Sequence, residues 1–148
     1  MTATQLAKLT MEKLKKLILA NGAHSSRNEG VCAMEAVAWL AGEPHSDKPS
    51  CACPTITRFV QYINDYATDE ARQDLKPALT LIIGTRTDDI ERLRRRAYLC
   101  ADFAVRVAAP WALDSARLPE QAAALRALPP VADATTAKNA QQAATGAR

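Results

Sequence analysis

Apolar residues recur at helical spacing along most of the chain, and this pattern predicts an all-α protein. In the first segment they indicate a helix over residues 4–20, which Asn21 and Gly22 end. The apolar face of this helix consists of Leu6, Leu9, Leu14, Leu17 and Ile18. A second stripe indicates a helix over residues 55–66 and consists of Ile56, Phe59, Val60 and Ile63.

A helix predicted over residues 29–41 differs from the others because its interior is apolar on every face. Glu35 is the only charge in that interior, and Gly42 followed by Pro44 ends the helix. A helix that is apolar all round is a buried helix. This segment is therefore predicted to be the central helix, around which the others pack.

Prolines shape two further segments. Pro77 lies within residues 70–83, and it predicts either one kinked helix or two short helices broken near Leu75. A short strand over residues 79–83 is a less favoured alternative. A last short helix is expected to begin at Pro119, which suits the first position of a helix, and to end before the next pair of prolines.

The longest helix is predicted over residues 88–109, with Thr87 as its N-cap and Pro110 as its limit. Its spacing predicts a core-facing stripe that consists of Ile90, Leu93, Ala97, Cys100, Ala104 and Val107.

Length and composition agree with a helical domain. The chain has 148 residues, of which 48% are apolar and only five are glycine, and this disfavours a turn-rich β fold. From residue 131 onward the apolar periodicity ceases, so residues 131–148 are predicted to be a disordered tail. The prediction is a single domain over residues 1–130, a compact bundle of about five to six helices around a central buried helix.

Charge gives little support to nucleic-acid binding. The net charge is +3, from 19 basic and 16 acidic residues, which is too mild to indicate a nucleic-acid partner. The conspicuous basic cluster consists of Arg92, Arg94, Arg95 and Arg96. It is explained as a solvated helix face, because Asp88–Arg92 and Glu91–Arg95 have the i,i+4 spacing of ion pairs.

No segment of the sequence predicts a membrane protein. The longest apolar run, residues 31–42, is interrupted by Glu35 and is too short to span a bilayer. Because neither a secretory signal nor a lipidation motif is recognisable, the chain is expected to be cytoplasmic. In that compartment its four cysteines are expected to be thiols or metal ligands.

Candidate chemistry concentrates in residues 22–54, which hold both histidines and three of the four cysteines. One interpretation is a zinc site, since zinc takes four ligands from Cys and His. The coherent ligand set consists of His24, Cys32, His45 and Cys51. Glu35 could replace or orient a ligand. The spacing matches no standard zinc motif, because there is no C-x-x-C pair.

Two other interpretations of the same residues remain open. Cys32 near a helix N-terminus could be a nucleophile, with His45 as general base and Glu35 or Asp47 orienting it. No family signature of a cysteine nucleophile accompanies them. Alternatively Cys32 is a small core residue, and Glu35 is a buried carboxylate paired with Arg86, with an arginine of the 92–96 cluster or with loop amides. This structural interpretation is favoured.

A motif in this region resembles one in known proteins. The run CAMEAVAWLAGEPHSD over residues 32–47, followed by Pro49 and Cys51, is similar to small uncharacterised helical proteins of bacteriophages and actinobacteria. Gly84-Thr85-Arg86 and residues 95–98 and 123–129 also match that pattern, whereas Cys53 lies outside it. The resemblance spans residues 22–130. It implies a phage or bacterial accessory protein and assigns no activity.

The sequence therefore predicts a non-catalytic accessory protein that acts by binding a macromolecular partner, a protein in the first place. Trp111, directly after Pro110, is expected at a surface, and an exposed Trp111 with Leu113 would support a partner-binding patch. The hypothesis predicts an exposed apolar surface or a homo-oligomer. One alternative is a small enzyme or ligand-binding domain that uses Cys32, Glu35 and His45. The other is a zinc-stabilised helical module. Outside the zinc hypothesis, no cofactor is expected.

Overall fold

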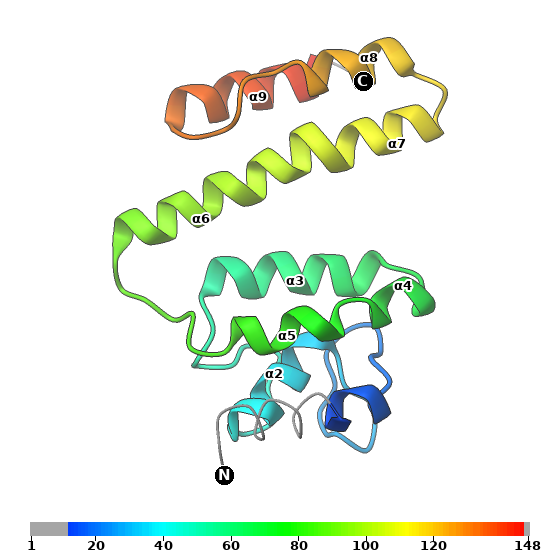
Figure 1. The fold of residues 1–148 in the computed structure, drawn as a ribbon, viewed down its shortest axis with the longest axis vertical. Helices are drawn as coiled ribbons and strands as arrows, with labels where there is room; N and C mark the ends of the chain where they lie inside the picture. The colour runs from blue at the N-terminus through cyan, green and yellow to red at the C-terminus, as the bar shows by residue number, and fades with distance from the viewer. Residues whose placement is uncertain (1–11, 147–148) are drawn as a thin grey trace. The chain divides into compact units, whose positions relative to one another are not determined.

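The computed structural model describes residues 12–146, and the regular elements within that range are all helices (Figure 1). The predicted all-α class is confirmed. The chain divides into two compact units, residues 1–87 and residues 88–148, whereas the sequence predicts one domain over residues 1–130. Among the described residues, no helix is long and apolar enough to cross a membrane.

The first unit begins, within the described range, with a helical segment over residues 12–16. The N-terminal part of the predicted helix, with Leu6 and Leu9, lies outside the described residues. The helix ends before residue 17 rather than at residue 20, because the following residues bond to distant parts of the chain. The N–H of Ala20 donates to the carbonyl of Val31 (2.8 Å), and the N–H of Leu19 donates to the side chain of Gln73 (3.0 Å).

Four more helices complete the first unit: α2 (Ala33–Ala41), α3 (Pro54–Tyr66), α4 (Asp69–Gln73) and α5 (Lys76–Ile82). The predicted break near Leu75 is confirmed, as two short helices, and the strand alternative for residues 79–83 is wrong. Leu75 adopts helical backbone angles but caps α5, and Pro77 stands in the first turn of α5, where its missing N–H leaves no hydrogen bond unmade.

Helix α2 forms the centre of the first unit, as predicted. All its residues from Ala33 to Ala38 are buried, and it packs against α3 and α5. The buried cluster around it consists of Leu14, Leu19, Val31, Cys32, Ala33, Met34, Ala36, Val37, Ala52, Leu79 and Ile82. Because α2 is apolar on every face, it can be covered from several sides at once.

A buried asparagine links three segments of the first unit. The Asn64 side chain accepts a hydrogen bond from the N–H of Ala33 (3.0 Å) and donates one to the carbonyl of Ala20 (3.0 Å). Arg72, also buried, donates from Nε to the carbonyl of Asn64 (2.7 Å) and from Nη2 to that of Ala67 (2.8 Å). These bonds join the start of α2 to α3 and to the corner before α4.

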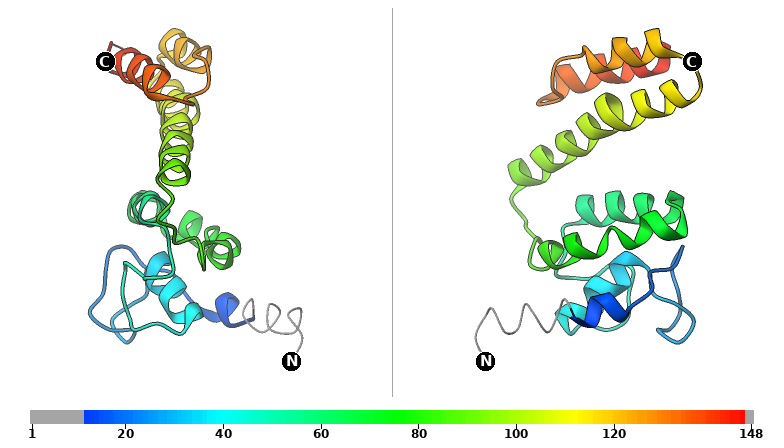
Figure 2. Two further views of the ribbon diagram at one scale, coloured as in Figure 1. Left: turned by 90° about the vertical axis from the view of Figure 1, so that its left-hand side faces the viewer. Right: turned by 45° about the vertical axis from the view of Figure 1, so that its right-hand side comes forward.

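The second unit consists of α6 (Ile90–Phe103), a π-helical turn η1 (Ala104–Ala108), α7 (Ala109–Ser115), α8 (Pro119–Arg126) and α9 (Ala134–Gly146). Helices α6, η1 and α7 follow one another as one rod (Figures 1 and 2). The expectation that Pro110 limits this helix is wrong. The N–H of Ala109 donates to the carbonyl of Ala104, five residues back, and this wider turn admits a proline that an α-helical interior would exclude.

The core of the second unit does not lie where the spacing of α6 predicts. No residue of α6 is buried, and Ile90 and Val107 of the predicted core stripe are exposed. The buried residues come instead from α7, α8, α9 and the α8–α9 connection, and they are Pro110, Ala122, Leu125, Val131 and Ala140. Burial in this unit follows the contacts of α8 with α7, and of α9 with α6, η1 and α8, rather than the periodicity of α6 alone.

The structure also differs from the predicted disordered tail, because residues 134–146 form α9. Asp133 accepts a hydrogen bond from the N–H of Thr136 (2.8 Å), and the Thr136 hydroxyl accepts one from the N–H of Asp133 (3.0 Å). This reciprocal pair caps the start of the helix. Alanine supplies the helix propensity and, through Ala140, the buried contact, without the large apolar residues that periodicity detects.

We expect Asn64→Ala to lower the free energy of unfolding of the first unit by about 2–3 kcal/mol, because it leaves the buried N–H of Ala33 and the partly buried carbonyl of Ala20 without the Asn64 side chain. The measurement is urea unfolding followed by Trp39 emission in a Trp111→Phe background. Asn139→Ala is the matched control, since Asn139 is exposed on α9. An Asn64→Ala protein as stable as the control would contradict the assigned role.

Candidate functional site

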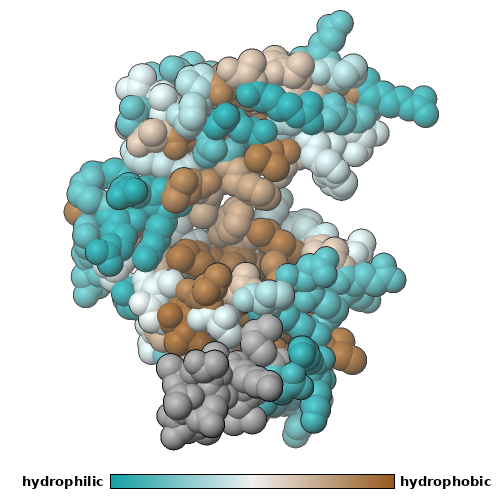
Figure 3. All heavy atoms as spheres, in the orientation of Figure 1, coloured by the Kyte–Doolittle hydropathy of each residue, from teal (hydrophilic) through white to brown (hydrophobic). Residues whose placement is uncertain are grey.

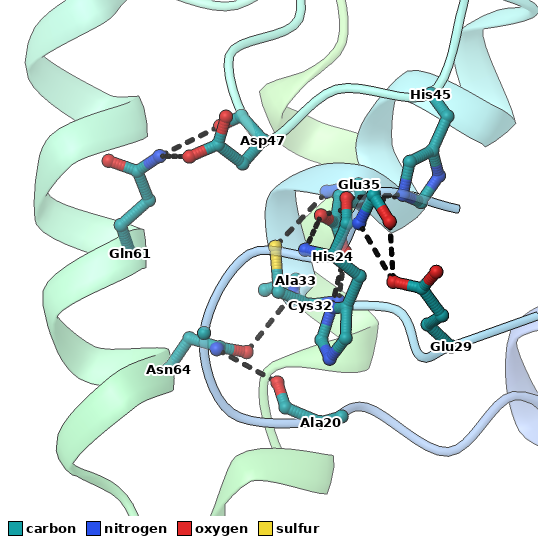
Figure 4. A network of polar contacts seen from close by, with 12 residues as sticks. Ala20, His24, Glu29, Cys32, Ala33, Glu35, His45, Asp47, Gln61 and Asn64 are labelled. Atoms are coloured by element: carbon teal, nitrogen blue, oxygen red, sulfur yellow. Dashed lines mark hydrogen bonds and ion pairs between the residues drawn. The ribbon is translucent and has the colours of Figure 1, made fainter. Parts of the chain in front are cut away.

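Four of the residues singled out by sequence, namely His24, Cys32, Glu35 and His45, meet around the Glu35 carboxylate at the start of α2 (Figure 4). Helix α2 begins at Ala33 rather than at residue 29, with Cys32 as its N-cap. The N–H of Cys32 donates to Oε2 of Glu35 (2.8 Å), and the N–H of Glu35 donates to Sγ of Cys32 (3.5 Å). This is a capping box in which a cysteine takes the place of the usual serine or threonine.

Both histidines approach the same carboxylate. His24 donates its backbone N–H to Oε1 of Glu35 (2.6 Å), and its Nδ1 lies 2.9 Å from Oε2. Nε2 of His45 lies 3.5 Å from Oε1 of Glu35 and 3.1 Å from the carbonyl of His24. His24, Cys32, Glu35 and His45 are called the Glu35 cluster below. They come from two loops and the first turn of one helix.

Gly30 allows the His24 ring to reach Glu35. A Cβ at position 30 would lie 2.4 Å from Nε2 of His24, and the backbone there has φ +156°. Any other residue would push the ring away from the carboxylate. The sequence contains Gly30 but gives no sign of this contact, because His24 is six residues away and reaches it only after the loop closes.

Hydrogen bonds hold Glu35 ionised although its side chain is buried. Burial by itself raises the pKa of Glu35, but the hydrogen bonds from the N–H groups of Cys32 and His24 and from the His24 ring outweigh it. The net pKa therefore lies below its ordinary value of 4.5. The partners of Glu35 are thus histidines and backbone amides, and the arginine partners that the sequence suggested are not used.

Cys32 has the environment of a structural thiol. Burial raises its pKa to about 12, and the nearby Glu35 carboxylate also opposes ionisation. A nucleophilic cysteine needs a thiolate near neutral pH, so the proximity of Cys32, Glu35 and His45 does not by itself make a catalytic unit. The cluster instead fastens the loop before α2 and the loop after it to the first turn of the helix.

Cys51, the fourth residue of the predicted zinc set, lies against a different carboxylate. Its N–H donates to Oε1 of Glu43 (2.8 Å), and the N–H of Ser50 donates to Oε2 of the same residue (2.6 Å). Burial is the main cause that raises the pKa of the Cys51 thiol, and the hydrogen bond between this thiol and the Glu43 side chain raises it further. Within residues 12–146, no group of three or more His, Cys, Asp or Glu side chains is arranged to hold a metal ion.

Segments that the sequence resemblance connects lie side by side in the first unit. The N–H of Arg86 donates to the carbonyl of Cys51 (3.0 Å), and the N–H of Cys53 donates to the hydroxyl of Thr85 (3.0 Å).

No family model, curated protein or solved structure matches the chain. The resemblance to phage and actinobacterial proteins therefore stays a prediction, and function is argued from geometry.

An apolar stripe on the rod of the second unit is the surface that the sequence argument missed. It consists of Leu99, Phe103, Val107 and Trp111, all exposed, and is called the α6–α7 face below. The expected exposure of Trp111 is confirmed, at 72%, whereas Leu113 is only partly exposed. The four residues of the stripe are spaced four apart in the sequence, and this spacing could have indicated a stripe on one helix. It was overlooked because the helix was assumed to end at Pro110.

We expect Glu35→Gln to destabilise the protein by about 2–4 kcal/mol at neutral pH, since an amide cannot accept all the hydrogen bonds that the carboxylate accepts. The folded pKa is lowered, so the wild-type advantage is fully present above pH 4.5 and shrinks as the pH falls through the folded value. Urea unfolding of both proteins across this range is the measurement. Glu70→Gln, at an exposed position of α4, should show no such pH-dependent difference.

We expect Cys32 and Cys53 to resist alkylation in the folded protein, because they are 3% and 0% exposed. At pH 8 with iodoacetamide, each should react about 100-fold more slowly than in the urea-unfolded chain. Peptide mass spectrometry measures the four sites separately, with the partly exposed Cys100 as reference. Labelling of Cys32 as fast as that of Cys100 would instead support thiol chemistry.

Proposed function

We propose that this chain is a non-catalytic accessory protein of a phage or bacterium that binds a protein partner through the α6–α7 face. The observation that carries the proposal is the exposure of four large apolar side chains in one stripe, with Leu99 67% and Trp111 72% exposed. Contiguous exposed apolar residues mark interaction surfaces, whereas single ones do not. Hydrophobic residues that reach the surface are brown in Figure 3.

The π turn supports the proposal because it keeps the stripe straight. Four residues advance an α-helix about 40° beyond a full turn, so a stripe with this spacing drifts around a plain α-helix. The turn η1, between Phe103 and Ala109, has more residues per turn. It reverses the drift, so that Val107 and Trp111 continue the line of Leu99 and Phe103.

The charge at the start of the stripe indicates the chemistry of the partner. Arg95 precedes Leu99 by one turn and is exposed. The predicted i,i+4 pairs are not the ones formed: Arg92 pairs with Asp89 and Arg94 pairs with Glu91. Arg95 consequently makes no ion pair among the described residues. The partner segment that fits this face is an amphipathic helix with an apolar stripe and an acidic end.

The alternatives have less support from the geometry. The Glu35 cluster is engaged in fastening loops to α2, and its thiol has a raised pKa. Zinc would need ligands that come together, which the described residues do not supply. The α6–α7 face, by contrast, is exposed apolar surface.

The first test is whether the face is open in the free protein. In a Trp39→Phe background Trp111 is the only tryptophan, and we expect solvent-exposed emission with strong acrylamide quenching. A photo-crosslinking residue is then placed at Val107 in cells, with Ala97, an exposed position on the opposite side of α6, as the control.

We expect a protein to be captured from position 107 and not from position 97. The identified partner, purified, should bind the wild-type chain, and Trp111→Ala should weaken that binding about tenfold or more. Trp111 emission already protected in the free chain, or equal binding of the purified partner to the variant, would contradict the proposal.

A further inference from the structure

A pocket of about 480 Å³ on the first unit carries three cationic side chains. Lys48, Arg58 and Arg86 line it, and Pro49, Ala52 and Pro54 supply apolar wall. Its volume lies within the range of about 300–1,000 Å³ that small-molecule sites occupy. The lining residues come from the loop before α3, the first turns of α3 and the segment after α5. No acidic residue is among them.

The cations of this pocket are unneutralised. Among the described residues, the side chains of Lys48, Arg58 and Arg86 make no ion pair and no hydrogen bond. The nearby carboxylate of Asp47 is engaged with Nε2 of Gln61 (2.9 Å). Three unpaired positive charges around one concavity produce a local field that attracts an anion.

A hydroxyl without a partner adds a donor to the charges. Thr57 lines the pocket, and although the residue is only 6% exposed, its hydroxyl oxygen is accessible and makes no hydrogen bond among the described residues. It is therefore available to donate to a ligand in the pocket. Helix α3 also begins here without a side-chain cap from Cys53, so its first N–H groups add positive potential to the same pocket.

We infer that this pocket binds a small organic phosphate monoester. A phosphate monoester carries nearly two negative charges at neutral pH and three acceptor oxygens, which suit three cations and a hydroxyl donor better than a singly charged carboxylate does. The walls formed by Pro49, Ala52 and Pro54 would contact the organic part of the ligand. This inference concerns the first unit and does not depend on the α6–α7 face.

The test uses phenyl phosphate as the probe and the full-length protein, with binding followed by amide chemical shifts in NMR spectra. We expect saturable shifts at residues 48–61 and at Arg86. Arg58→Gln and Arg86→Gln should each weaken binding about tenfold. Thr57→Val, which keeps the shape of the side chain, should weaken it by a smaller factor. Arg95→Gln, also an exposed and unpaired arginine, should leave the affinity unchanged.

Further probes decide the class of ligand. Inorganic phosphate and phenyl sulfate should bind at least about tenfold more weakly than phenyl phosphate, because one lacks the apolar group and the other carries a single charge. Equal binding of inorganic phosphate would show an adventitious ion only and overturn the inference. So would the absence of saturable shifts, loss of binding in Arg95→Gln, or tighter binding of a phosphopeptide or a single-stranded oligonucleotide.

Discussion

The buried carboxylate of Glu35 is the constraint on which the first unit depends. A charge that is removed from water is tolerated only where hydrogen bonds replace its hydration. The hydrogen-bond donors to Glu35 come both from its own helical turn and from other segments. The N–H of Cys32 lies in the cap, whereas the N–H and ring of His24 and the ring of His45 lie on separate loops. Satisfying one carboxylate therefore closes both loops around α2.

The same use of acids for loop closure explains the charge left on the surface. Glu43 accepts hydrogen bonds from the amides of Ser50 and Cys51, and Asp47 is held by Gln61. Carboxylates engaged with amides in this loop are not available to neutralise neighbouring cations. The result is a loop whose acids are engaged by amide groups, beside a concavity lined with the unpaired cations Lys48, Arg58 and Arg86.

The second unit is organised by a different constraint. A proline in a long helix removes one hydrogen bond and crowds the preceding turn, and the π turn before Pro110 relieves the crowding. Pro110 is then buried in a helix that packs on α8, while the apolar residues spaced by four stay in line on an exposed side. A single local change in helical pitch thus serves both the core of this unit and the surface proposed for a partner.

Local patterns in the sequence determined the helical class, the burial of α2 and the break near Leu75, because periodicity and proline stereochemistry act within a few residues. They also singled out His24, Cys32, Glu35 and His45 as candidates, but together with Cys51, which the fold places against Glu43 instead. Only the tertiary structure decided what these residues do, since the donors to Glu35 depend on where two loops return. The tertiary structure also decided that the helix continues past Pro110, through a π turn. It likewise decided the helix after residue 133, because that helix is rich in alanine, which gives little apolar signal in the sequence.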